Sequence, residues 1–177
     1  QARVLRENGD RAAARELWVK LVESETTSVD ARLEAQLSLA DLQMEEGDPD
    51  GALARFNTLL QQTENPSTRQ RITLGMADAL LRMGRLQEAE TYYEGLLPVS
   101  GQEVAVRCRL GLAHSAELRG QLEKASSLYL AVSHIEGPWA LEALLSLSEL
   151  REKSGDLKGA VEVLRLAHSL SGSEPER

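Results

Sequence analysis

Aromatic residues are scarce in this chain of 177 residues, where they make up 3% with a single Phe. The core must therefore be built from Leu, Ala, Val and Met, as in tightly packed helices. The five prolines all lie near the ends of apparent helices, which also favours an all-helical chain. A single Cys excludes an internal disulfide and leaves the redox compartment open.

Positive charge is also in deficit, since the net charge is −8 and the pI is about 5.0. This balance argues against binding to nucleic acid, whose phosphates need a basic surface, and against binding to anionic membranes. No run of about 18 apolar residues is present that could span a bilayer. The HExxH, CxxC, GxSxG, phosphate-loop and EF-hand patterns are missing as well. We therefore expect a non-enzymatic protein with no catalytic, metal or cofactor site.

One isolated group of chemically capable side chains lies between residues 108 and 117. His114 and Glu117 share a helix face, and Cys108 lies one and a half turns earlier. Short matches of this kind are mostly accidental. The sequence favours Cys108 as a small packing residue and His114 as a surface or groove residue.

Glycines punctuate the chain at a regular spacing. A glycine followed five residues later by an alanine begins at Gly9, Gly47, Gly84, Gly120 and Gly155, at intervals of 38, 37, 36 and 35 residues. Each of these motifs lies between two segments with helical periodicity. Glycine adopts the left-handed conformation that ends a helix, and alanine allows the next helix to approach closely. The pattern predicts five helix pairs joined by tight turns.

The periodicity places the pairs at residues 1–8 with 10–23, 30–46 with 49–62, 68–83 with 86–97, 102–119 with 122–134, and 138–154 with 157–170. Asp48 is expected to cap a helix that begins at Pro49. Two capping boxes are expected, at residues 67–70 and 100–103. Gly51, Gly75 and Gly159 could be hinges, but we favour close packing of helices around them.

Two further positions recur with each turn. The residue seven before the glycine is small in all five units: Ala2, Ala40, Ala77, Ala113 and Ser148. The residue nine after it is large: Trp18, Phe56, Tyr93, Tyr129 and Leu164. Together with the alanines, these positions resemble the tetratricopeptide repeat (TPR), a helix-turn-helix unit of about 34 residues. The family's Trp and Tyr of the first helix are absent, and the slightly long repeats are similar to TPR arrays of bacterial envelope assembly proteins.

The resemblance implies an all-α fold, a right-handed superhelical solenoid of antiparallel helix pairs. We expect one array over residues 1–170 with units at about 1–24, 29–62, 67–97, 101–134 and 138–170, followed by a polar tail at 171–177. Because the sequence starts at Gln1 without a signal peptide, it is expected to be a segment of a longer protein. The bacterial periplasm or cytoplasm is the expected compartment.

The resemblance also implies that the first helices line a concave groove. The positions that would point into it are Glu34, Leu37, Asp41, Met44, Arg71, Leu74, Asp78, Leu81, Arg107, Leu110, His114, Glu117, Glu142, Leu145, Glu149 and Glu152. The alternative is that many of them only flank neighbouring helices. Mixed apolar and charged positions suit a peptide or helix partner. Co-chaperone TPR domains use Lys and Asn to clamp a carboxylate, whereas Asp41, Asp78, His114 and Glu149 occupy the central positions here. They predict a partner with basic character.

The predicted function is that of a scaffold that binds a peptide or another protein in this groove. Two alternatives stay open: a self-assembling module that associates through its terminal helices, and a regulatory segment of a larger enzyme or sensor. Residues 157–170 are apolar over more than one helical stripe, although the outer face of a terminal repeat should be polar. We expect another repeat or another molecule to cover this helix, and a homo-oligomer formed through residues 157–170 is one possibility.

Overall fold

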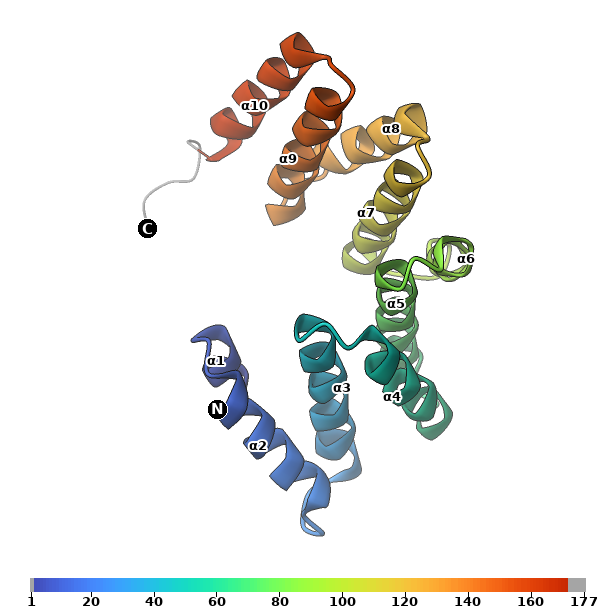
Figure 1. Cartoon of the computed structure of the whole chain (residues 1–177). Coiled ribbons are helices and arrows are strands. Elements are labelled where there is room, and N and C mark those ends of the chain that lie inside the picture. The colour runs from blue at the N-terminus through green and yellow to red at the C-terminus, as the bar shows by residue number, and fades with distance from the viewer. Residues whose placement is uncertain (1, 172–177) are drawn as a thin grey trace. The chain divides into compact units, whose positions relative to one another are not determined.

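The computed structural model describes residues 2–171 of the chain, and these form helices joined by short connections, with no strand among them (Figure 1). The helices are α1 (Ala2–Glu7), α2 (Arg11–Glu23), α3 (Val29–Glu45), α4 (Pro49–Gln62), α5 (Pro66–Arg82), α6 (Leu86–Leu96), α7 (Gln102–Leu118), α8 (Leu122–Ser133), α9 (Pro138–Lys153) and α10 (Leu157–Ser171). The predicted all-α class and the predicted helix pairs are confirmed. Residues 172–177, most of the predicted polar tail, lie outside the described part.

The five turns share one backbone geometry. Each turn glycine has a positive φ, between 71° at Gly120 and 86° at Gly155. The N–H of Gly47 donates to the carbonyl of Met44, and the N–H of Asp48 donates to that of Gln43. The same two bonds recur at the other four turns. They satisfy the last carbonyls of the first helix, which is why a residue that tolerates the left-handed region is needed there.

The residue after each turn glycine is also the N-cap of the next helix. The carboxylates of Asp10, Asp48 and Asp156 accept hydrogen bonds from the backbone N–H groups of the residues three further on, at 2.9–3.1 Å. The cap at Asp48 with Pro49 following it is confirmed. Each turn therefore ends one helix and starts the next with no spare residues.

The two predicted capping boxes are wrong. Asn65 caps α5 by accepting from the N–H of Thr68, and Pro66 occupies the first turn. The helix starts before Ser67 because proline needs no hydrogen-bond partner for its nitrogen. The N-cap of α7 is Gly101 without a side-chain bond, and the Oγ of Ser100 is buried without a partner.

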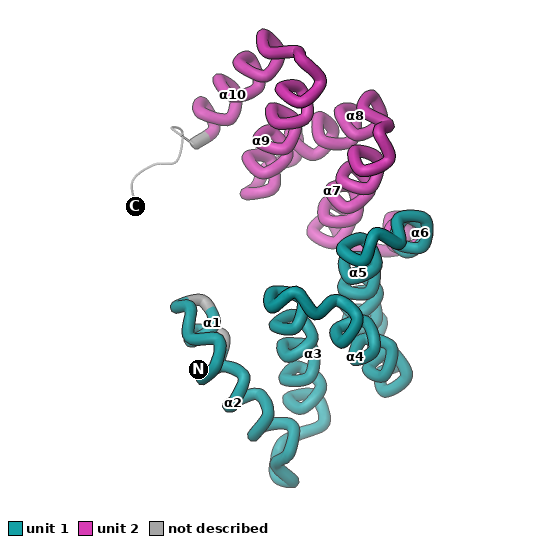
Figure 2. Tube along the Cα trace, in the orientation of Figure 1, with its two compact units in different colours: residues 1–92 teal, residues 93–177 magenta. Residues whose placement is uncertain are grey.

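The chain divides into two compact units, Gln1–Tyr92 and Tyr93–Arg177, with the boundary inside α6 (Figure 2). Because each unit is a separate body, the single array over residues 1–170 stays a prediction. The core of the first unit has one cluster from α1, α2 and α3 around Trp18 and another from α3, α4 and α5 around Phe56. The core of the second unit has one cluster from α7, α8, α9 and α10 around Tyr129 and a smaller one around Val132.

The small residues predicted to bring paired helices together lie where the sequence placed them. Ala40 and Ala52 are both fully buried in one cluster, and Ala113 and Ala125 are both fully buried in another. Gly75 in α5 lies against the ring of Phe56, which confirms the close packing expected there. Gly51 and Gly159 instead lie against the side chains of the capping residues Asp48 and Asp156.

Candidate interaction surfaces

The predicted groove residues of the first unit fall into a buried set and a polar set. Leu37, Met44 and Leu74 are 2%, 8% and 1% exposed, so they belong to the core and offer almost no surface. Leu37 and Met44 lie in the cluster that α3, α4 and α5 form together, so they pack against neighbouring helices, as the alternative interpretation anticipated. Leu81 is half-buried. A partner at this face would meet mainly the polar positions.

The polar set is ordered by an ion pair between two first helices. The guanidinium of Arg71 in α5 lies 2.5 Å from the carboxylate of Glu34 in α3. These residues occupy the same position of consecutive repeats, thirteen before the turn glycine. Seven residues further along the same helices, about two turns on, Asp41 is exposed and Asp78 is half-buried.

In the second unit, Glu117 links three helices. One of its carboxylate oxygens accepts from the Nζ of Lys153 at 2.8 Å, and the other accepts from the hydroxyl of Tyr129 at 3.3 Å. Burial raises the pKa of Tyr129, and the neighbouring charge of Glu117 raises this pKa further. The hydrogen bond to Glu117 likewise raises the pKa of Lys153. This predicted groove residue therefore serves to hold α7, α8 and α9 together.

Most of the other predicted positions of the second unit are open to solvent. Arg107, His114, Glu142, Leu145, Glu149 and Glu152 are exposed, and Leu110 is half-buried. His114 projects from the surface, whereas Cys108 is fully buried, so the structure does not combine them into a reactive site. Within the described residues, no three His, Cys, Asp or Glu side chains are grouped in a way that could hold a metal ion.

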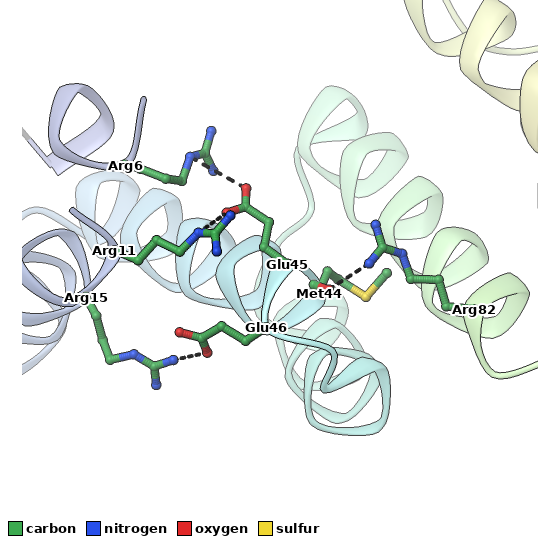
Figure 3. A network of polar contacts seen from close by, with 7 residues as sticks. All are labelled: Arg6, Arg11, Arg15, Met44, Glu45, Glu46 and Arg82. Atoms are coloured by element: carbon green, nitrogen blue, oxygen red, sulfur yellow. Dashed lines mark hydrogen bonds and ion pairs between the residues drawn. The ribbon is translucent and has the colours of Figure 1, made fainter. Parts of the chain in front are cut away.

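Arginines surround the C-terminal end of α3, an arrangement that the sequence analysis missed (Figure 3). Arg6 and Arg11 lie 3.9 and 3.4 Å from the carboxylate of Glu45, and Arg15 pairs with Glu46. Carboxylates at this end of a helix oppose its dipole, and the arginines offset that effect. Arg82 of α5 donates to the carbonyl of Met44 at 2.8 Å.

The contact of Arg82 has an equivalent in the second unit, made by Lys153, and the spacing of these residues in the sequence could have revealed both. Arg82 and Lys153 both lie two residues before a turn glycine, and each bonds to the residue three before the preceding turn glycine, Met44 or Glu117. Such contacts tie one repeat to the next, so these cations stabilise the stack and are not free for a partner.

The last repeat carries an exposed apolar face. Leu141 and Leu145 of α9 are 36% and 44% exposed, and Leu164 and Leu170 of α10 are 45% and 44% exposed. A hollow of about 540 Å³ adjoins Leu141 and Leu170, and it is also lined by the connection between α8 and α9. In contrast, Val163 and Ala167 of α10 are buried. The prediction that α10 is apolar beyond a single buried stripe is therefore reflected in its exposed leucines.

Comparison with known proteins agrees with this architecture. Two models of the tetratricopeptide repeat match the chain, one over residues 1–67 and the other over residues 43–107. The chain belongs to the tetratricopeptide repeat superfamily. Proteins of the TPR superfamily generally act as scaffolds for protein interactions. The comparison with curated proteins found no match.

Solved TPR structures share its all-α solenoid fold. A tetratricopeptide repeat protein from Parabacteroides merdae has a TM-score of 0.72 at 21% identity, over 98% of this chain and 63% of that one. A Podosopora anserina protein described as a kinesin light chain with nearly identical TPR-like repeats has a TM-score of 0.68 at 22% identity, over 95% and 90% of the two chains. The protein MamA has a TM-score of 0.63 at 18% identity, over 95% and 92%. At these identities the similarity concerns the fold alone.

No helix in the described part of this TPR chain is both long and apolar enough to cross a membrane.

Proposed function

We propose that this TPR chain binds a basic peptide segment of a partner protein along α3 and α5, the first helices of consecutive repeats in its first unit. The main support is the position six residues before each of the last four turn glycines, which holds Asp41, Asp78, His114 and Glu149. Three of the four are acidic, and all but Asp78 are exposed. Within the first unit, the consecutive first helices α3 and α5 thus carry an aspartate at equivalent points, a spacing suited to the alternating side chains of an extended peptide.

The ion pair between Glu34 and Arg71 also supports a basic peptide at this face. It pairs Arg71, the one basic residue among the groove positions predicted in the first unit, with a carboxylate, and Asp41 and Asp78 lie seven residues further along the same two helices. Complementary charge of this kind raises the association rate and selects against acidic partners. A partner that offers a free carboxylate would be repelled.

A peptide array screened against the chain, followed by fluorescence anisotropy with the best peptide, tests the proposal. Asp41→Lys combined with Asp78→Lys should weaken binding at least about tenfold, equivalent to about 1.4 kcal/mol. The matched control is Glu16→Lys combined with Glu23→Lys, two exposed positions on the second helix α2, which changes the net charge equally. The control should bind within about twofold of the unmodified chain, as expected for charges remote from the site.

Two results would contradict the proposal. An equal loss in both variants would mean that the net charge, and not this face, attracts the peptide. Unchanged binding by the first variant would move the site elsewhere. Because Asp78 is half-buried, the single variant Asp41→Lys and a thermal melt of each protein separate loss of binding from loss of folding.

A further inference from the structure

The way α9 covers the preceding repeat defines what an inter-repeat surface looks like in this chain. Val106 and Val132 are fully buried, and Ala143 of α9 packs against them. Leu110, Ile135 and Trp139 border the same cluster. Tyr129 of α8 is 3% exposed in the neighbouring cluster. An apolar face built from α7 and α8 is thus closed by a helix that contributes a small residue at its centre.

The last described repeat has the same face, and no helix among residues 2–171 covers it. The last two turn glycines are 35 residues apart, so residues 35 positions apart are equivalent in these two repeats. The equivalents of Val106, Leu110, Tyr129, Val132 and Ile135 are Leu141, Leu145, Leu164, Ala167 and Leu170, in that order. All five are apolar. Four of them are 36–45% exposed, whereas their counterparts are buried or half-buried. We call Leu141, Leu145, Leu164 and Leu170 the open face.

Charges at the edge of the open face indicate what would cover it. In two ion pairs between consecutive repeats, the cation comes from the helix that covers the preceding repeat. Arg71 of α5 pairs with Glu34 of α3, and Lys153 of α9 pairs with Glu117 of α7. The residues at the positions of Glu34 and Glu117 in the last repeat are Glu142 and Glu152, and both are exposed. By the same geometry, a helix on the open face would bring basic residues to these two glutamates.

We propose that the open face is a docking site for an amphipathic helix of a partner protein, with a small residue at its centre and basic residues along one edge. A second copy of this chain is a poorer occupant, because its net charge of −8 would be brought against an edge that is itself acidic. The site is distinct from the face of Asp41 and Asp78. Either of the two proposals can therefore fail while the other holds.

A peptide derived from α9 itself is a suitable probe, because α9 already fits the equivalent face one repeat earlier. The probe has the sequence of residues 138–153 with Glu142→Arg, blocked ends and a fluorescent label. The substitution places a cation at the position equivalent to Arg71 of α5, and the probe keeps the cation of Lys153. The control peptide has the unmodified sequence. We expect the substituted peptide to bind the chain at least about fivefold more tightly than the control peptide. In the protein variant Glu142→Arg, this order should reverse.

The apolar part of the site has its own matched control. Leu145→Ser combined with Leu164→Ser should weaken binding of the substituted peptide at least about tenfold. Leu130→Ser alters an α8 leucine that is 43% exposed but lies outside the open face, and it should leave binding unchanged. Thermal melts verify that each variant is folded.

Three results would overturn the proposal. One is binding that ignores the open-face variants, or no binding of either peptide. A second is a concentration-dependent dimer, seen by light scattering, that Leu164→Ser disrupts, since the occupant would then be a second copy. The third concerns the double variant Leu164→Cys, Cys108→Ala, in which residue 164 is the single cysteine. If this monomeric protein resists alkylation at residue 164, the open face is covered by its own chain.

Discussion

The ring of Phe56 occupies the space that a Cβ atom on residue 75 would need: a Cβ built on Gly75 would lie 2.5 Å from its Cζ. Phe56 belongs to the second helix of one repeat and Gly75 to the first helix of the next. The ring of Tyr93 meets Gly111 in the same way in the second unit. The large residue nine after the turn thus fits into a notch left by a missing side chain, and this contact holds consecutive repeats in register.

Filling the notch should destabilise the fold. Gly75→Ala and Gly111→Ala are each expected to lower the free energy of unfolding by about 1–3 kcal/mol, because the buried rings have little room to move. Gly95→Ala is the matched control, since it also lies in a helix but a Cβ there meets nothing within 4 Å. It should raise stability by about 0.5–1 kcal/mol through helix propensity. Urea denaturation measures the free energy of unfolding of all three variants. Adding Phe56→Leu to Gly75→Ala should recover part of the lost stability, because the smaller side chain leaves room for the new Cβ. If the double variant recovers none of it, the ring of Phe56 is not what Gly75 accommodates.

The turn between α7 and α8 can be improved. Gln121 holds the N-cap position at φ −85° and ψ 66°, nearly the conformation of Asp10 at φ −84° and ψ 70°, but makes no side-chain cap bond. Gln121→Asp should supply that bond and stabilise the second unit by about 1 kcal/mol. Asp48→Ala should cost a similar amount in the first unit. Thermal melts would reveal both changes, and an unaltered melting temperature in Gln121→Asp would show that backbone geometry alone does not determine the cap.

The start of α5 distinguishes the observed cap from the predicted one. Asn65→Ala removes the bond to the N–H of Thr68 and should cost about 1 kcal/mol. Ser67→Ala alters an exposed residue already inside the helix and should change stability by less than about 0.5 kcal/mol. Chemical denaturation of the two variants is the measurement, and the opposite ranking would restore the capping box at residues 67–70.

Alkaline pH should weaken the second unit through Tyr129. Its folded-state pKa is raised above the ordinary value of about 10, so the folded state holds the phenol proton more tightly than the unfolded state. The stabilisation is therefore complete below about pH 10 and is lost as the pH rises beyond it. Melting temperatures between pH 8 and 11 should fall less steeply in Tyr129→Phe than in the unmodified chain. Parallel curves for the two proteins would rule out this tyrosine as the cause.

Helices and turns were predictable here because their causes are local. A glycine that must adopt positive φ, an aspartate that caps the next helix, and apolar residues at helical spacing all act within a few residues of one another. Repetition strengthened the interpretation, since the same three positions recurred five times. Where two local signals competed, as at Pro66 and Ser67, the pattern alone chose the wrong start.

Exposure, by contrast, is decided by what packs on a residue from outside its own helix pair. Leu37 and Leu74 are 2% and 1% exposed, yet Leu145 at the same repeat position is 44% exposed. Local sequence does not distinguish them, but Leu37 packs in one cluster with Ile72, Met76 and Ala79 of the following repeat, whereas among the described residues no helix follows α10 to pack on Leu145 in this way. The contacts from Arg82 to Met44 and from Lys153 to Glu117 join residues 38 and 36 positions apart, so they form only when the helices stack, although the offsets of these residues from the turn glycines could be read in the sequence. The amino-acid order was enough for the repeat, its turns and its acidic character, because these follow from backbone preference and composition. Which of its leucines are core and which are available to a partner depended on the neighbours that three-dimensional packing supplies.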